Sequence, residues 1–259
     1  MFLAIDVGNT QSTLGLFDDE GQLAKGWRMT SNASDTSDML HARLFSYFLK
    51  DGYELADVSA AAVASVVPAL TRAWWRCLGD LLGRSPLLVN ATHDYGMPID
   101  MPNPRTVGAD RIANAIAARN AYGSPVIVVD FGTATNIDVV DGRGAYRGGA
   151  ISPGLMLSAN ALFGKAAKLA SIPVEAPEHA LGDATETAMQ SGLVIGAAAQ
   201  AEGLVSRMKA ELGIEQAKVI GTGGLARTVS RATDLFDAVD PTLTLRGIRE
   251  IWLQQHGGA

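Results

Sequence analysis

The sequence is poor in cysteine: its 259 residues include one, Cys77, so no disulfide can form within the chain. Cys77 stands among bulky apolar residues, which predicts a buried thiol. Long apolar runs are also missing, because the most apolar stretches, residues 60–70 and 193–199, are too short to cross a membrane. No basic segment precedes the first apolar residues, so we expect no secretory signal peptide. These absences favour a cytoplasmic protein that makes no membrane contact.

An excess of positive charge is missing as well. The chain has 21 lysines and arginines against 27 aspartates and glutamates, which gives a formal net charge of −6. The basic residues are scattered, whereas a surface that binds nucleic acid gathers them on one face. The four histidines, at positions 41, 93, 179 and 256, do not have the spacing of metal ligands. The sequence therefore argues against nucleic acid as a partner and against zinc chemistry.

Residues 2–18, FLAIDVGNTQSTLGLFD, are the first stretch whose pattern points to chemistry. An apolar run ends at Asp6, Gly8 follows, and small polar residues lead into a second apolar segment. This pattern predicts a strand, a tight polar turn and another strand. Glycine lets the main chain approach a ligand closely, and main-chain N–H groups with small hydroxyl side chains bind phosphate. Asp6 would then hold a metal ion or its waters, because a bare carboxylate repels phosphate.

Residues 126–141, VIVVDFGTATNIDVVD, repeat this pattern with Asp130 in the place of Asp6. The two aspartates lie 124 residues apart, close to half of the chain, which indicates a duplicated unit. A single Asp-x-Gly turn is also compatible with an ordinary β-hairpin. Two such turns, each at the end of an apolar strand, favour a phosphate site between two similar domains.

The rest of the first half predicts alternating helices and strands. In order, we expect a strand at 23–30, a helix capped by Ser34 or Asp35, a strand at 58–67, a helix from Pro68, and a strand at 86–90. The second of these helices carries Trp74 and Trp75, and both are expected in the hydrophobic core.

The second half predicts a similar succession. We expect strands at 126–130, 135–140 and 145–151, a helix at 155–169, a long helix from about 184 to 212, and a strand at 218–220. The last strand runs into Gly-Thr-Gly-Gly at 221–224 and then into a helix. A glycine-rich turn between a strand and a helix suits a nucleotide, here the adenosine end. The turn lacks the GK[ST] element of a P-loop.

A proline-rich loop, residues 91–107, leads to Gly-Ala-Asp-Arg at 108–111 and to a helix that continues to Tyr122. One interpretation of Asp110 is structural, since an acid in the first turn complements the helix dipole and can pair with Arg111. The other is catalytic, because the loop delivers Asp110 just before the second Asp-x-Gly strand. A carboxylate there could take a proton from a substrate hydroxyl, and Arg111 could hold an anionic group.

These elements predict an α/β fold with two duplicated actin-like (ribonuclease H-like) domains and ATP bound in the cleft between them. Residues 1–115 would form an N-terminal domain with the first phosphate turn. Residues 116–259 would form a C-terminal domain with the second phosphate turn and the adenosine side. This is the layout of actin-like ATPases and sugar kinases.

The ordered set of motifs resembles the type III pantothenate kinase family over nearly the whole chain. The motifs are IDVGNT at the start, then VGADR, VDFGTAT, GGAISPG, GTGG and LTLRG. The resemblance implies transfer of the γ-phosphoryl group of ATP to the primary hydroxyl of pantothenate, the first step of coenzyme A synthesis. It also implies a homodimer, Mg²⁺ with the ATP, and a monovalent cation, K⁺ or NH₄⁺.

The resemblance further implies roles for individual residues. The phosphate-binding segment would be Asp6, Val7, Gly8, Asn9, Thr10, Gln11, Ser12 and Thr13, with Asp6 oriented toward Mg²⁺. Asp130 would bind the monovalent cation, and Thr133 would make a second contact with ATP. Pantothenate would contact Gly108, Ala109, Asp110, Arg111 and Thr185, with Asp110 as the proton acceptor. At position 101, where many members of the family carry a tyrosine, this chain has methionine.

Two other functions are compatible with the same motifs. One is a different small-molecule kinase on the same fold, which would share the phosphate turns and differ in its acceptor. The other is a regulator that retains the fold without catalysis. The presence of Asp6, Asp110, Asp130 and Thr133 argues against lost catalysis, and the acidic charge argues against direct contact with DNA.

Overall fold

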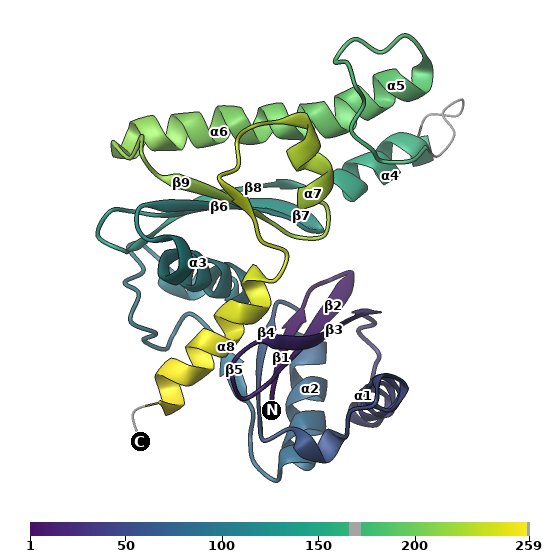
Figure 1. Cartoon of the computed structure of the whole chain (residues 1–259), viewed down its shortest axis with the longest axis vertical. Coiled ribbons are helices and arrows are strands. Elements are labelled where there is room, and N and C mark those ends of the chain that lie inside the picture. The colour runs from purple at the N-terminus through teal and green to yellow at the C-terminus, as the bar shows by residue number, and fades with distance from the viewer. Residues whose placement is uncertain (166–171, 258–259) are drawn as a thin grey trace. The chain divides into compact units, whose positions relative to one another are not determined.

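The computed structural model describes residues 1–165 and 172–257, and it contains two compact α/β units (Figure 1). The first unit comprises Met1–Gly96, Asn103–Ala117 and the chain from Leu243 onward. The second unit comprises Met97–Pro102 and Ala118–Thr242. The expected division into residues 1–115 and 116–259 stays a prediction. Among the described residues, no helix is both long and apolar enough to cross a membrane.

The first unit is built on a five-stranded sheet in the order β3-β2-β1-β4-β5. The central strand β1 runs antiparallel to β2 and parallel to β4. The elements of the unit are β1 (Phe2–Val7), β2 (Gln11–Phe17), β3 (Leu23–Thr30), α1 (Ser37–Asp51), β4 (Ala60–Ser65), α2 (Pro68–Leu82), β5 (Leu87–Val89), α3 (Ala109–Tyr122) and α8 (Leu243–His256). Helix α3 is shared, because its residues after Ala117 count with the second unit.

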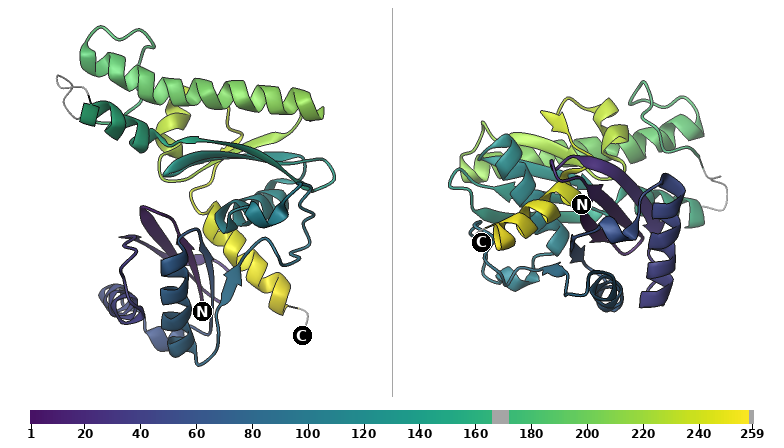
Figure 2. Two further views of the ribbon diagram at one scale, coloured as in Figure 1. Left: turned by 180° about the vertical axis from the view of Figure 1, so that it is seen from behind. Right: turned by 60° about the horizontal axis from the view of Figure 1, so that its bottom comes forward.

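The alternation of side chains along β1 explains how helices cover both faces of this sheet. Leu3, Ile5 and Val7 point to one face and pack in a core with the buried residues of α1 and α2, two helices that lie side by side (Figure 2). Phe2 points to the other face, where its ring centroid lies 5.0 Å from that of Trp252 on α8. The C-terminal helix therefore completes the first unit, although more than 200 residues of sequence separate these two rings.

Several local expectations for this unit need correction. The N-cap of α1 is Thr36, whose Oγ1 accepts a hydrogen bond from the N–H of Met39 at 3.3 Å, and not Ser34 or Asp35. Trp74 is buried, whereas Trp75 is 41% exposed, because neighbouring residues on a helix point about 100° apart. Cys77 is buried as predicted, and burial raises the pKa of its thiol to about 12.

The second unit repeats the arrangement with a five-stranded sheet in the order β10-β9-β6-β7-β8. Its long helix α6 runs along one face of the sheet (Figure 1). The elements are β6 (Val126–Phe131), β7 (Ala134–Val140), β8 (Tyr146–Pro153), α4 (Leu155–Lys165), α5 (Thr185–Gln190), a π-helical turn (Ser191–Ile195), α6 (Gly196–Leu212), β9 (Lys218–Thr222), α7 (Ala226–Val229) and β10 (Ala238–Val239). Of the helix expected at 155–169, residues 166–169 lie outside the described residues. The long helix expected at 184–212 begins at Thr185 and is interrupted by the π turn.

The duplication predicted from the two Asp-x-Gly turns is confirmed. In both sheets the central strand pairs antiparallel with the next strand of the chain and parallel with the strand that follows a helix. Strands β1 and β6 share one pattern of burial, in which the aspartate is the half-buried member of an otherwise buried strand. Asp6 lies opposite Thr13 and Asp130 lies opposite Asn136, so the second turn is one residue shorter.

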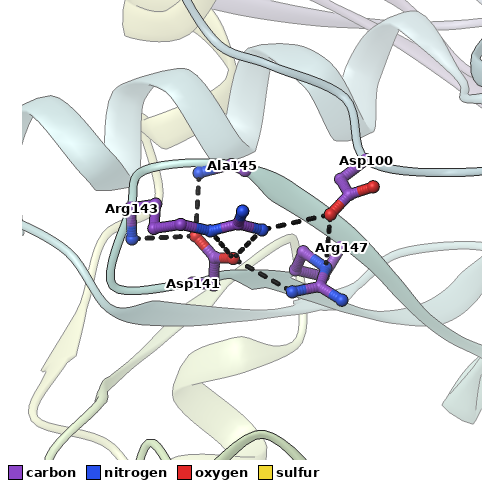
Figure 3. Close-up of polar contacts among 5 residues, drawn as sticks. All are labelled: Asp100, Asp141, Arg143, Ala145 and Arg147. Atoms are coloured by element: carbon purple, nitrogen blue, oxygen red, sulfur yellow. Dashed lines mark hydrogen bonds and ion pairs between the residues drawn. The ribbon is translucent and has the colours of Figure 1, made fainter.

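A cluster of charged side chains attaches the segment Met97–Pro102 to β7 and β8 (Figure 3). Asp141 accepts hydrogen bonds from the main-chain N–H groups of Arg143 and Ala145 at 2.9 and 3.1 Å. It also accepts hydrogen bonds from the guanidinium groups of Arg143 and Arg147. Asp100 accepts a hydrogen bond from Arg143 at 3.1 Å and lies 3.5 Å from Nε of Arg147. Although burial opposes ionisation of Asp141, these bonds lower the pKa of its carboxyl to about 2.

The cluster predicts how stability depends on pH. The pKa of the Asp141 carboxyl is about 2 in the folded chain, against an ordinary value of 3.8. Its ionised form therefore stabilises the fold above about pH 4, and this stabilisation is lost as the pH falls toward 2. We expect Asp141→Asn to lower the free energy of unfolding by about 2 kcal/mol at pH 7, with a shrinking difference below pH 4. Urea unfolding at several pH values measures this. Asp234→Asn, an exposed aspartate of the same unit, serves as the control. A difference from wild type that does not change with pH would contradict the assignment.

Candidate active site

The first polar turn, between β1 and β2, is a narrow loop with exposed polar side chains. Its N–H at Gly8 donates to the carbonyl of Gln11 at 3.0 Å, and a Cβ on Gly8 would lie 3.0 Å from the same oxygen. Asn9, Thr10 and Gln11 are exposed. Glycine therefore allows the tight closure, and the loop presents main-chain and small polar groups at its tip.

The remaining residues of this segment sit deeper. Asp6 is half-buried at the end of β1, Val7 and Ser12 are buried, and Thr13 lies opposite Asp6 across the two strands. One carboxylate thus stands directly beside a turn rich in hydrogen-bond donors. This combination fits a phosphate chain that carries a divalent cation, because Mg²⁺ takes one or two carboxylates and fills its other positions with phosphate oxygens and water.

Asp110 lies in the first turn of α3, and its carboxylate folds back over Gly108. A Cβ on Gly108 would lie 2.5 Å from Oδ1 of Asp110, so this position accepts only glycine without displacing the carboxylate. Oδ1 of Asp110 accepts the N–H of Arg111 at 2.9 Å. Burial raises the pKa of Asp110, although the N–H and the charge of Arg111 oppose the rise. The carboxyl is therefore a stronger base than an exposed aspartate once it has lost its proton.

Val66, just after β4, connects this turn with the end of β1. Its N–H donates to the carbonyl of Val7 at 3.1 Å, and its Cγ1 would lie 3.6 Å from a Cβ on Gly108. The first unit therefore brings the Asp6–Thr13 segment and the Gly108–Arg111 turn, which are about 100 residues apart in sequence, to one end of its sheet.

In the second unit, two distant glycines pack against the turn that follows β6. A Cβ on Gly154 would lie 2.3 Å from the carbonyl oxygen of Thr133, and the N–H of Gly154 donates to that oxygen at 3.1 Å. Gly223 has φ +91, and its Cβ would lie 2.4 Å from Oδ1 of Asp130. The Gly-Thr-Gly-Gly turn predicted to bind nucleotide therefore touches Asp130 directly. The sequence does not reveal this contact, because it joins residues more than 90 positions apart.

Thr185, also in the second unit, is exposed and begins α5. The main chain of α5 packs against Gly182, where a Cβ would lie 2.2 Å from the nitrogen of Ala188. Thr185 borders an open, mainly apolar hollow of about 520 Å³, whose other lining residues are Leu162, Ala188, Met189, Gly192 and Leu193.

The acids do not form a preassembled metal site. Among residues 1–165 and 172–257, no group of three or more histidine, cysteine, aspartate or glutamate side chains could hold a metal ion. The carboxylate of Asp130 is half-buried and lies close to Gly132 and Gly223.

Comparison with known sequences gives a consistent picture. Residues 2–207 match the family model described as type III pantothenate kinase. A type III pantothenate kinase from Moorella thermoacetica is 42% identical over 252 residues, which cover 97% of this chain and 98% of that protein.

Comparison with solved structures concerns the fold alone, because the identities are low. A conserved protein of Campylobacter jejuni, proposed as a Baf family transcriptional activator, is 18% identical with a TM-score of 0.65. The match covers 99% of this chain and 100% of the Campylobacter chain. A ROK family glucokinase of Streptomyces griseus, solved with glucose and AMPPNP, is 12% identical with a TM-score of 0.52 and covers 99% of both chains. The actin-like, sugar-kinase type of fold predicted from the sequence is confirmed.

The contact between Gly223 and Asp130 gives a prediction about stability. We expect Gly223→Ala to lower the free energy of unfolding by at least ~2 kcal/mol, because the new Cβ meets Asp130 and Phe131 in a left-handed backbone conformation. Gly224→Ala is the matched control, since no atom lies within 4 Å of its added Cβ, and it should stay within about 0.5 kcal/mol of wild type. Urea unfolding measures both, and equal effects would refute the close packing.

Proposed function

The chain belongs to the type III pantothenate kinase family, and from this premise we propose which of its residues perform the transfer of phosphate from ATP to pantothenate. The protein is an ATP-dependent kinase of coenzyme A synthesis, as the ordered sequence motifs predicted. The observation that carries the proposal is the position of Asp110, a carboxylate with a raised pKa in the same unit as the first polar turn.

Asp110 acts as the general base. A primary hydroxyl is a poor nucleophile, and it becomes a better one when a carboxylate accepts its proton during the transfer. Burial makes the ionised form of Asp110 less stable than in water, so its affinity for the proton is higher. The N–H of Arg111 donates to Oδ1 at 2.9 Å and so helps to orient the carboxylate. General-base catalysis of this kind contributes about 10²- to 10⁴-fold.

The acceptor is held by the turn that contains the base. The turn around Asp110 consists of Gly108, Ala109 and Arg111. The guanidinium of Arg111 is suited to the carboxylate of pantothenate. Thr185 is a further substrate-binding residue that the family resemblance implies, and within the second unit it borders an apolar hollow. Support for these roles comes from the exposure of Thr185 and from the position of Gly108 under the Asp110 carboxylate.

Each unit supplies one phosphate-binding turn. In the first, the segment Asp6–Thr13 presents N–H groups and hydroxyls to the phosphate oxygens, and Asp6 holds Mg²⁺ or its waters. In the second, Thr133 contacts the phosphates, Asp130 holds the monovalent cation, and the turn at 221–224 receives the adenosine end. ATP with its Mg²⁺ supplies the activated phosphoryl group. The protein contributes placement of the hydroxyl and stabilisation of charge, which dominate phosphoryl transfer.

The family resemblance also suggests the location, the oligomeric state and the partners of the enzyme. We place it in the cytoplasm as a homodimer, with ATP and pantothenate as its small-molecule partners. Another small-molecule kinase on this fold remains the alternative that a substrate panel distinguishes. Among the relatives, the Campylobacter jejuni protein described as a transcriptional activator shares the fold at 18% identity, and this likeness does not favour a regulator here.

The role of Asp110 predicts a loss of turnover without a loss of nucleotide binding. We expect Asp110→Asn to lower kcat for pantothenate by ~10²-fold or more, while the affinity for the ATP analogue AMPPNP stays close to that of wild type. Coupled ADP release and calorimetry measure the two quantities. Asp38→Asn is the matched control, because Asp38 also occupies the first turn of a helix and is exposed.

The pH dependence gives a second readout of the same residue. A base must be ionised, so kcat/KM should fall as the pH decreases through the pKa of Asp110, which lies above the ordinary 3.8. This acid limb should be absent in Asp110→Asn. Turnover of the variant at the wild-type rate, with an unchanged pH profile, would remove Asp110 from the role of base.

The cation role of Asp130 predicts dependence on the monovalent ion. We expect turnover in K⁺ or NH₄⁺ to exceed turnover in Na⁺, and Asp130→Asn to raise the K⁺ concentration for half-maximal activity by about tenfold or more. Asp234→Asn is the control for a lost negative charge in this unit. Equal rates in Na⁺ and K⁺ would show that the assignment of Asp130 is wrong.

A further inference from the structure

We propose that Ser31, at the end of β3, is a positioning residue that holds the first phosphate turn in its binding conformation. The proposal rests on the function proposed for residues 6–13. Ser31 belongs to none of the motifs on which that function was based, and its sequence neighbours carry no recognisable signal. The contacts that single it out come from the fold of the first unit.

Ser31 makes two hydrogen bonds with the segment that we assign to phosphate binding. Its N–H donates to the carbonyl of Thr10 at 3.0 Å, and its Oγ lies 2.8 Å from Oγ of Ser12. Ser12 is only 1% exposed, so its hydroxyl exchanges little with water. The residue that follows β3 therefore bonds the neighbours of Gln11 on both sides, at the point where the turn enters β2.

Ser31 is itself held in place by the connection to α1. In this connection, the N–H of Asp35 donates to the carbonyl of Asn32 at 2.9 Å. The carboxylate of Asp35, which is buried, accepts two hydrogen bonds from Arg43 on α1, at 2.5 and 2.9 Å. A bidentate arginine–carboxylate pair has a defined geometry, so it orients the connection as well as anchoring it. Asp35 thus ties α1 to Asn32, the residue that directly follows Ser31.

This support matters because the turn binds through its main chain. N–H groups recognise phosphate oxygens only when several of them point at one place, and a turn that must be ordered on binding loses affinity. The tip of the turn is exposed, and the N–H of Gly8 closes it by donating to the carbonyl of Gln11. The hydroxyl of Ser31 restrains the turn at Ser12, where it enters β2, so this hydroxyl should determine how well the turn is preorganised for ATP.

A positioning role of Ser31 predicts a selective effect on ATP, whereas a general loss of stability would affect both substrates. Ser31→Ala keeps the N–H bond to Thr10 and removes the hydroxyl contact with Ser12. We expect the KM for ATP and the dissociation constant of AMPPNP to rise about tenfold, while the KM for pantothenate changes less than about twofold. Ser31→Thr, which retains the hydroxyl, should restore ATP affinity. Ser34→Ala is the matched control, because the Ser34 hydroxyl bonds only Asn32 in the same connection.

A double-mutant cycle tests whether Ser31 acts through Ser12. If the hydroxyl pair carries the effect, Ser12→Ala combined with Ser31→Ala should weaken AMPPNP binding no more than Ser12→Ala alone. Additive losses would overturn the proposed route. Wild-type affinity in Ser31→Ala, or an equal rise in both KM values, would overturn the proposal itself. Failure of the proposed function would look different, since wild-type protein would then release no ADP in the presence of pantothenate.

Discussion

The arrangement of the second unit's site depends on the close approach of main-chain segments that only glycine permits. The turn after β6 is enclosed by Gly154 on one side, which packs on the carbonyls of Gly132 and Thr133, and by Gly223 on the other, beside Asp130. A Cβ on Gly154 would lie 2.3 Å from the carbonyl oxygen of Thr133, and a Cβ on Gly223 would lie 2.4 Å from Oδ1 of Asp130. Three segments that are distant in sequence thereby meet at one short turn.

The two halves share an architecture, but the surroundings of Asp6 and Asp130 differ. Asp6 has Ala64 beside it on the parallel strand, whereas Asp130 has Thr222, whose hydroxyl donates to the carbonyl of Asp240 at 2.7 Å. The second turn is also one residue shorter. The two acids therefore share a fold but have different surroundings.

Much of this structure could be predicted from the sequence, because the signals are local. Apolar runs that end in Asp-x-Gly located the central strands, and Pro68 located the start of α2. Other features depend on contacts between distant residues, for which no periodic pattern exists. The packing of α8 on β1 through Trp252 and Phe2 is one such feature.

The candidate site divides in the same way. Asp6, Asp110 and Asp130 could be selected from motifs, since each acid stands next to a glycine-containing turn. Ser31 could not, because its importance arises only when β3 pairs with β2 and places it beside Thr10. Gly247 belongs to the LTLRG motif, but its role is visible only in the fold, where a Cβ would lie 2.0 Å from the carbonyl oxygen of Ala113 on α3.

The central claim is that this chain passes the γ-phosphoryl group of ATP to the primary hydroxyl of pantothenate. The most direct test is ³¹P NMR, supported by mass spectrometry, of a mixture of the purified protein with ATP, Mg²⁺, K⁺ and pantothenate. The account predicts one phosphorylated pantothenate for each ADP, with the phosphate on the primary hydroxyl. ADP accompanied only by inorganic phosphate, at a rate independent of pantothenate, would contradict it.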